Sequence, residues 1–203
     1  MLEFFDRVDE VRARWDVLRH PFYERWARGE LAPAELAFYA GQYRHAVVAL
    51  ADATAHAGDE GHAAEERSHV ALWDAFLHFV GGDVDASATP HTAACAAAWA
   101  HEDRDRAATL AALYAIEAAQ PAIAEAKLVG LLEHYGAAGG SEATRYFEVH
   151  AVLDHDHAEH DREALVAVME SADEERLLAE IGRVLQANWQ LLDDVQAHAK
   201  LAA

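Results

Sequence analysis

Long helix-forming stretches with few breaks constrain this chain more than any other feature of its sequence. Only four prolines and eleven glycines interrupt 203 residues that are rich in alanine, leucine, glutamate and arginine, all of which favour helices. No stretch alternates between apolar and polar residues for long enough to predict a strand. We therefore expect an all-α, single-domain bundle over residues 1–203, with about seven to eight helices.

Proline or glycine stands at most of the expected helix boundaries. Pro121 is expected to kink the sixth helix, because proline removes an internal hydrogen bond. Gly139, Gly140 and Ser141 predict a turn and a helix start. The expected helices cover about 2–19, 21–28, 33–56, 62–80, 91–101, 104–135, 141–170 and 173–200.

Charge and cysteine content exclude several classes of protein. Acidic residues outnumber basic ones 36 to 16, which gives a formal charge of −20 and argues against a nucleic-acid partner. No apolar run approaches the roughly 20 residues that span a bilayer, so we expect no membrane partner. The single cysteine, Cys95, excludes an internal disulfide and a zinc site with several thiolates. A cytoplasmic location is the expectation.

The strongest chemical pattern lies in the seventh expected helix, where residues 146–160 read YFEVHAVLDHDHAEH. At about 100° per residue, His150, Asp154 and His157 share one face, whereas His155 and Glu159 point away from it. Two imidazoles and a carboxylate on one face suit a divalent first-row metal. A solvated surface run of histidine and aspartate is the alternative.

Two other expected helices offer matching groups. Glu66 and His69 are three residues apart, and Glu65 and His69 are four apart, so either pair shares a face. The alternative is a solvated Glu/Arg face with His69 at its edge. Glu117 lies in a strongly apolar stretch, where an ionised carboxylate is costly unless it is paired or bound to metal. Its alternative is the exposed stripe of an amphipathic helix.

Together these positions supply three carboxylates and three imidazoles, a set that suits two Fe(II) ions with positions left open for O2. A site with one metal, held by the triplet on the seventh helix alone, is the smaller version. The candidate metal ligands are Glu66, His69, Glu117, His150, Asp154 and His157.

The whole chain resembles the heme-oxygenase-like helical family, which includes thiaminase II and the pyrroloquinoline quinone synthase fold. Within it, the chain is most similar to the heme-oxygenase-like diiron oxidases, and among them to the branch of the chlamydial protein associating with death domains. The most specific match is YFEVHAVLDHDH, which keeps the H-x3-D-x2-H run of the diiron oxidases. Three further stretches match: HPFYERWARGELAPAELAFYAGQYRH at 20–45, HVALWDAF at 69–76 and LYAIEAAQPAIAEAKLVGLLEHYG at 113–136.

The resemblance implies that the histidines and acids of the set above are iron ligands. The family's remaining ligand is a glutamate on the helix of His69, and Glu66 fits an E-x2-H arrangement like that of the undecene-forming fatty-acid decarboxylase. Glu65 is the fallback at this position. Two Fe(II) ions and O2 are the implied cofactors, with manganese as an alternative ion.

The resemblance also implies roles for three residues beside the metal site. Tyr23 matches a tyrosine thought to be consumed as the source of an aminobenzoate ring, and Lys127 matches a lysine implicated as the amino donor. Tyr146 matches a residue that could line the pocket. Packing roles are the alternatives for Tyr23 and Lys127. Ile116 departs from the chlamydial pattern, which has a tyrosine there, and this weakens a parallel in radical chemistry.

We therefore expect an iron-dependent, O2-activating oxidase. It would oxidise a small amine or carboxylate substrate, or its own side chains in making p-aminobenzoate for folate. A cofactorless enzyme of the quinone-synthase type and a non-catalytic interaction protein are the alternatives. Thiaminase II is a poorer match, because Leu113-Tyr114-Ala115-Ile116 stands where that branch has its cysteine, and Cys95 reads as a small buried residue. A homodimer is expected from the family alone.

Overall fold

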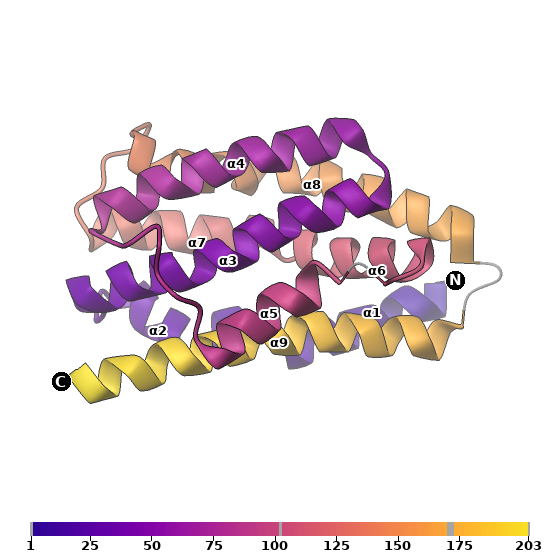
Figure 1. The fold of residues 1–203 in the computed structure, drawn as a ribbon, viewed down its shortest axis with the longest axis horizontal. Coiled ribbons are helices and arrows are strands. Elements are labelled where there is room, and N and C mark those ends of the chain that lie inside the picture. Colours follow the sequence, from indigo (N-terminus) through magenta and orange to yellow (C-terminus); the bar gives the residue numbers. More distant parts are fainter. Residues whose placement is uncertain (1, 102, 170–172, 203) are drawn as a thin grey trace.

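The computed structural model describes residues 2–101, 103–169 and 173–202, and over these residues it contains helices and no strand (Figure 1). This confirms the expected all-α fold. The described residues form nine α-helices and one short 3-10 helix: α1 Leu2–Arg14, η1 Val17–Arg19, α2 Pro21–Ala27, α3 Pro33–Ala57, α4 Glu60–Phe79, α5 Pro90–Trp99, α6 Arg106–Glu117, α7 Gln120–Glu133, α8 Glu142–Val168 and α9 Glu174–Ala202.

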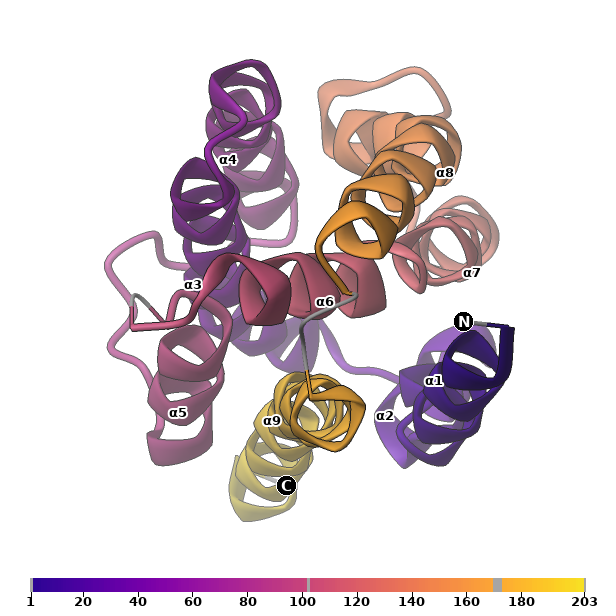
Figure 2. The same cartoon turned by 90° about the vertical axis from the view of Figure 1, so that its right-hand side faces the viewer.

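Helix α6 runs through the middle of the bundle. It packs against α3, α8 and α9, and α4 packs against both α3 and α8 (Figures 1 and 2). Helix α5 lies against α9, and α7 lies against α8. The C-terminal end of α6 therefore reaches the space between α4 and α8, the two helices that carry most of the candidate ligands.

The expected first helix over 2–19 is too long. Helix α1 ends at Arg14, and a 3-10 turn follows because the Asp16 side chain accepts a hydrogen bond from the backbone N–H of Leu18 at 3.1 Å. His20 then caps α2, since its Nδ1 accepts from the backbone N–H of Phe22 at 3.0 Å. These local side-chain bonds compete with continuation of the helix.

The expected kink in the helix over 104–135 is a complete break. Helix α6 ends at Glu117 and α7 begins at Gln120, so that Pro121 lies in the first turn of α7. Proline is tolerated there because the N–H that it lacks has no partner within the helix. The break makes Glu117 the last residue of α6.

The apolar stretch Arg106–Glu133, which includes this break, is long and apolar enough to cross a membrane by length and composition alone. The expectation that no run approaches this length is therefore too strict. Its most apolar window is 72% buried inside the bundle, as the central helix of a folded domain would be, and such a single stretch is weak support for a membrane span.

Candidate metal centre

Three helices bring histidines and acids together in the interior of the bundle. Helix α4 supplies Glu66 and His69, and α6 supplies Glu117 from its last turn. Helix α8 supplies the H-x3-D-x2-H triplet, in which His150 and Asp154 are each only 1% exposed. All six candidate ligands lie in one cluster, and each belongs to at least one group of neighbouring residues that could hold a metal ion.

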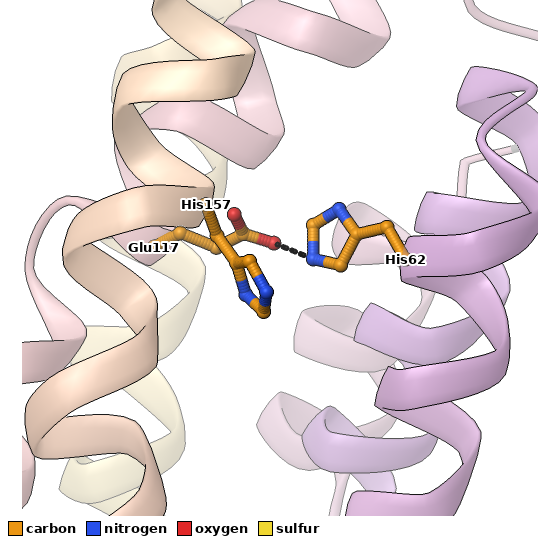
Figure 3. A group of neighbouring side chains, drawn as sticks. All are labelled: His62, Glu117 and His157. Carbon is orange, nitrogen blue, oxygen red and sulfur yellow. Dashed lines mark ion pairs between the residues drawn. The ribbon is translucent and has the colours of Figure 1, made fainter.

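The cluster contains two such groups that share no residue. One consists of Glu66, His69 and His150, and the other consists of His62, Glu117 and His157 (Figure 3). Within each group, one potential ligand atom per residue lies within 4.8 Å of the others. Asp154 forms a third, overlapping group with Glu66 and His157, and so it lies between the first two.

The hydrogen bonding of His150 favours metal binding. Its Nδ1 lies 2.7 Å from the backbone carbonyl of Tyr146, which can only accept a hydrogen bond. Nδ1 therefore carries the proton, and Nε2 keeps a lone pair directed at the cluster. Metal-binding histidines are commonly oriented by such a bond from the other ring nitrogen. Burial also lowers the pKa of His150 to about 4, so its imidazole is neutral at pH 7.

The acids of the cluster are crowded and deeply buried. Burial, followed by the nearby Glu66, raises the pKa of Glu117 well above its usual value. Burial, followed by Glu66 and Glu117, raises the pKa of Asp154 to about 9. Glu66 is the exception: burial acts to raise its pKa, but the hydrogen bond with His69 and the neighbouring histidines lower it overall. In the part of the chain that the structure describes, these three carboxylates form ion pairs only with histidines.

The residues fit a metal because several of their buried polar atoms make no hydrogen bond. Buried polar atoms without a hydrogen bond gather at this place, whereas buried polar groups in folded proteins are normally bonded. A divalent cation would satisfy these lone pairs and balance the buried negative charge. The unpartnered atoms are Nε2 of His62 and His150, Nδ1 of His157, both Glu117 carboxylate oxygens and Oδ2 of Asp154 and Asp161.

Burial distinguishes several of the open alternatives. Glu66 is 2% exposed, whereas the Glu65 side chain lies at the rim, 42% exposed, with Oε2 3.4 Å from Nε2 of His157. His69 and Glu117 are buried, so neither the solvated Glu/Arg face nor the exposed helix stripe is correct. The inward placement of the α8 triplet is the arrangement that the enzyme interpretation requires.

Two residues of the cluster were not anticipated from the sequence. His62 is four residues before Glu66, and Asp161 is four residues after His157. Each therefore repeats the four-residue spacing of His150 and Asp154, which puts side chains on one helix face. The H-x3-E-x2-H pattern at 62–69 matches the H-x3-D-x2-H pattern at 150–157, and this repetition was the available signal.

Tyr23, Lys127 and Tyr146 lie among buried, closely packed aromatic rings that adjoin the cluster. The Nζ atom of Lys127 lies 4.3 Å from the ring centre of Tyr43 and 5.6 Å from that of Tyr23. The Tyr23 hydroxyl is hydrogen-bonded to the Tyr39 hydroxyl at 2.8 Å. Tyr146 stacks on His150 with ring centres 3.9 Å apart, and so it connects these aromatic rings to the cluster.

Lys127 is expected to destabilise the fold at neutral pH. Burial lowers its pKa from 10.5 to about 7, so between these pH values the unfolded chain binds a proton that the folded chain does not. The free energy of unfolding therefore rises as the pH increases through this window. At pH 7 the penalty is roughly 3 to 5 kcal/mol, after attraction between the ammonium group and the surrounding rings offsets part of it.

The variant Lys127→Met tests this, because methionine has a similar shape and no charge. At pH 7 it should unfold at a higher denaturant concentration than the wild type. The difference in free energy should shrink as the pH approaches 10.5. A difference that stays constant from pH 7 to pH 10 would show that the lysine does not lose its proton on folding.

Comparison with known proteins places the chain in a family. A family model described as iron-containing redox enzyme matches residues 40–193 of the chain. The 4-aminobenzoate synthase of Nitrosomonas europaea is 28% identical over an alignment of 229 residues. The alignment covers 95% of this chain and 90% of the relative. The 4-aminobenzoate synthase of Chlamydia muridarum is 27% identical over 214 residues, with 95% and 89% covered.

A solved structure gives the fold. A domain of unknown function with a heme oxygenase-like fold from Shewanella denitrificans superposes with a TM-score of 0.81 at 21% identity, over 95% of this chain and 91% of that one. The expected heme-oxygenase-like architecture is therefore confirmed.

Cys95 is fully buried on α5, as expected of a small packing residue.

Proposed function

Because the chain belongs to the family of iron-containing redox enzymes, we propose that it holds two Fe(II) ions, uses O2 as the oxidant and forms 4-aminobenzoate. The relatives from Nitrosomonas europaea and Chlamydia muridarum are both named 4-aminobenzoate synthase, which supports this product. One observation carries the proposal: a buried cluster of histidines and acids, several of whose ligand atoms make no hydrogen bond, adjoins the packed aromatic rings around Tyr23 and Lys127.

The proposed iron ligands are Glu66, His69, Glu117, His150, Asp154 and His157. Iron bound there would supply the reduction of O2. The protein supplies a dry environment, because the ligands from α4, α6 and α8 are buried or nearly so. Tyr146, stacked on His150, is the aromatic residue that connects the cluster to the rings around Lys127.

We propose that the protein consumes its own side chains, with Tyr23 as the source of the ring and Lys127 as the source of the amine nitrogen. Both are buried, at 4% and 1% exposure, so water is excluded from them. Because burial lowers the pKa of Lys127 to about 7, a large fraction of its amine is neutral at pH 7 and has a free lone pair. Each chain would then act once.

A second candidate function is the repeated oxidation of a diffusible small amine or carboxylate. A cavity of about 340 Å³ opens beside the break between α6 and α7 and is lined by Arg12, Trp99, Ile116, Gln120 and Asn188 among others. The Gln120 amide nitrogen lies 3.4 Å from the Tyr43 hydroxyl, so Gln120 stands between this cavity and the aromatic rings around Lys127. A small substrate could enter there.

An anaerobic titration of the metal-free protein with Fe(II), followed by mixing with O2 and a reductant, tests the proposal. We expect two iron ions per chain and at most one 4-aminobenzoate per chain, and in His157→Ala we expect loss of the product and of at least one iron ion. His155→Ala is the matched control, because His155 is on the same helix but exposed. A wild type that binds no iron would overturn the proposal. Several products per chain with Tyr23 intact would favour the diffusible substrate.

A further inference from the structure

His62 lies in the first turn of α4 and faces the candidate metal centre. Asp59 caps this helix by accepting a hydrogen bond from the backbone N–H of His62 at 2.9 Å, which fixes where the helix begins. The His62 side chain is buried, and its Nε2 lies 3.3 Å from Oε1 of Glu117 (Figure 3). Among the described residues this Nε2 makes no hydrogen bond, so it is available to bind a cation.

The two helices that carry histidines face each other with matching patterns. The rings of His62 and His157 are 4.1 Å apart between centres, and those of His69 and His150 are 4.6 Å apart. The earlier histidine of α4 thus faces the later histidine of α8, so the two helices are antiparallel here. Of the acids between the histidines, Glu66 forms a group with His69 and His150, and it forms a second group with Asp154 and His157.

This pairing divides the cluster into two sets of the same composition. At one end lie Glu66, His69 and His150, and at the other end lie Glu117, His62 and His157. Each set offers two imidazoles and one carboxylate, a combination that binds Fe(II) and leaves coordination positions open. Without His62, the second set would have a single imidazole. Asp154 is left over between the two sets.

We propose that His62 is a metal ligand, and that this chain has a four-histidine centre with two histidines and one carboxylate at each end. The proposal rests on the proposed iron function and adds to it a residue and a division of the ligands. Its consequence is selective: loss of His62 should empty the site at the Glu117 end and leave the site at the Glu66 end filled.

Co(II) tests this directly, because its binding is counted by calorimetry and by its visible absorption without any turnover. The wild type should bind two Co(II) ions per chain. His62→Ala should bind one ion with unchanged affinity, while the affinity for the second falls by at least about a hundredfold. His78→Ala is the matched control, since His78 is on the same helix, exposed and bonded only to the Asp74 carbonyl among the described contacts.

Two further variants separate ligation from a structural role. His62→Gln keeps a hydrogen-bond donor for Glu117 but loses the imidazole, so it should also bind one ion. His62→Glu supplies a carboxylate in place of the imidazole and should recover the second ion. Binding of two ions at wild-type affinity by folded His62→Ala or His62→Gln would overturn the proposal.

Metal binding by the wild type and by His62→Ala separates the role of His62 from the proposed iron function. A wild type that binds no Co(II) or Fe(II) contradicts both. A wild type that binds two ions together with a His62→Ala variant that also binds two contradicts only the role of His62. If the alanine variant does not fold, anomalous scattering from Co(II) in wild-type crystals decides the matter, because a peak at about 2.1 Å from Nε2 of His62 is required.

Discussion

Glu66→Ala is expected to weaken metal binding at both ends of the cluster. Glu66 belongs to two of the three candidate ligand groups, one with His69 and His150 and one with Asp154 and His157. It is also the one acid of the three whose pKa is lowered, because its hydrogen bond with His69 and the nearby histidines outweigh burial, so it is ionised before a metal arrives. Loss of this ligand should exceed the roughly 10- to 100-fold cost of removing an outer-shell partner.

Thermal or denaturant unfolding in the presence of Co(II) measures this effect. A metal present at a hundred times its dissociation constant stabilises a single-site protein by about 2.7 kcal/mol. The wild type should show a stabilisation of at least this size, and Glu66→Ala should show almost none. Glu65→Ala is the matched control, because Glu65 is the neighbouring residue at the rim of the cluster. Equal loss in both variants would contradict the assignment of Glu66.

Tyr23→Phe is expected to abolish formation of 4-aminobenzoate while leaving metal binding intact. The change removes one hydroxyl and its hydrogen bond to Tyr39, which costs about 0.5 to 1.5 kcal/mol of stability. A phenyl ring without the hydroxyl is much harder to oxidise than a phenol, so the proposed ring source is lost. The metal cluster should be unaffected, because Tyr23 is not one of its ligands.

Mass spectrometry of protein made with ring-labelled tyrosine checks this prediction. After reaction with Fe(II), O2 and a reductant, the wild type should release labelled 4-aminobenzoate, and the peptide that holds Tyr23 should change in mass. Tyr135→Phe should behave as the wild type, because Tyr135 bonds to the backbone of Leu31 and Trp26 and is not among the rings around Lys127. Unlabelled product, or full product from Tyr23→Phe, would contradict a self-consuming reaction.

The sequence was most informative where local chemistry acts alone. Proline and glycine positions predicted most helix ranges, and the 100° spacing placed His150 and Asp154 on a buried face of α8. The same reasoning failed at 104–135, where Pro121 begins a new helix instead of bending one. A single proline fits both outcomes, and the packing of α7 against α8 decides between them.

The rest of the site depends on contacts between helices that are distant in the sequence. The sequence offered His62 on α4, but only the facing of α4 and α8 places it beside His157 and Glu117. The surroundings of Lys127 also depend on contacts between distant helices. The rings of Tyr43 and Trp73 come from α3 and α4, whereas the lysine is on α7. Helical periodicity assigns a residue to one face of its own helix. It does not say which neighbouring helix packs against that face.

The most direct test of the central claim is anomalous diffraction at the iron edge from crystals grown without O2 and supplied with Fe(II). Two iron peaks per chain are expected between α4, α6 and α8, one beside Glu66, His69 and His150 and the other beside His62, Glu117 and His157. Fe(II)-saturated crystals without an iron peak in this cluster would contradict the account, and the buried histidines and acids would then require an explanation other than metal binding.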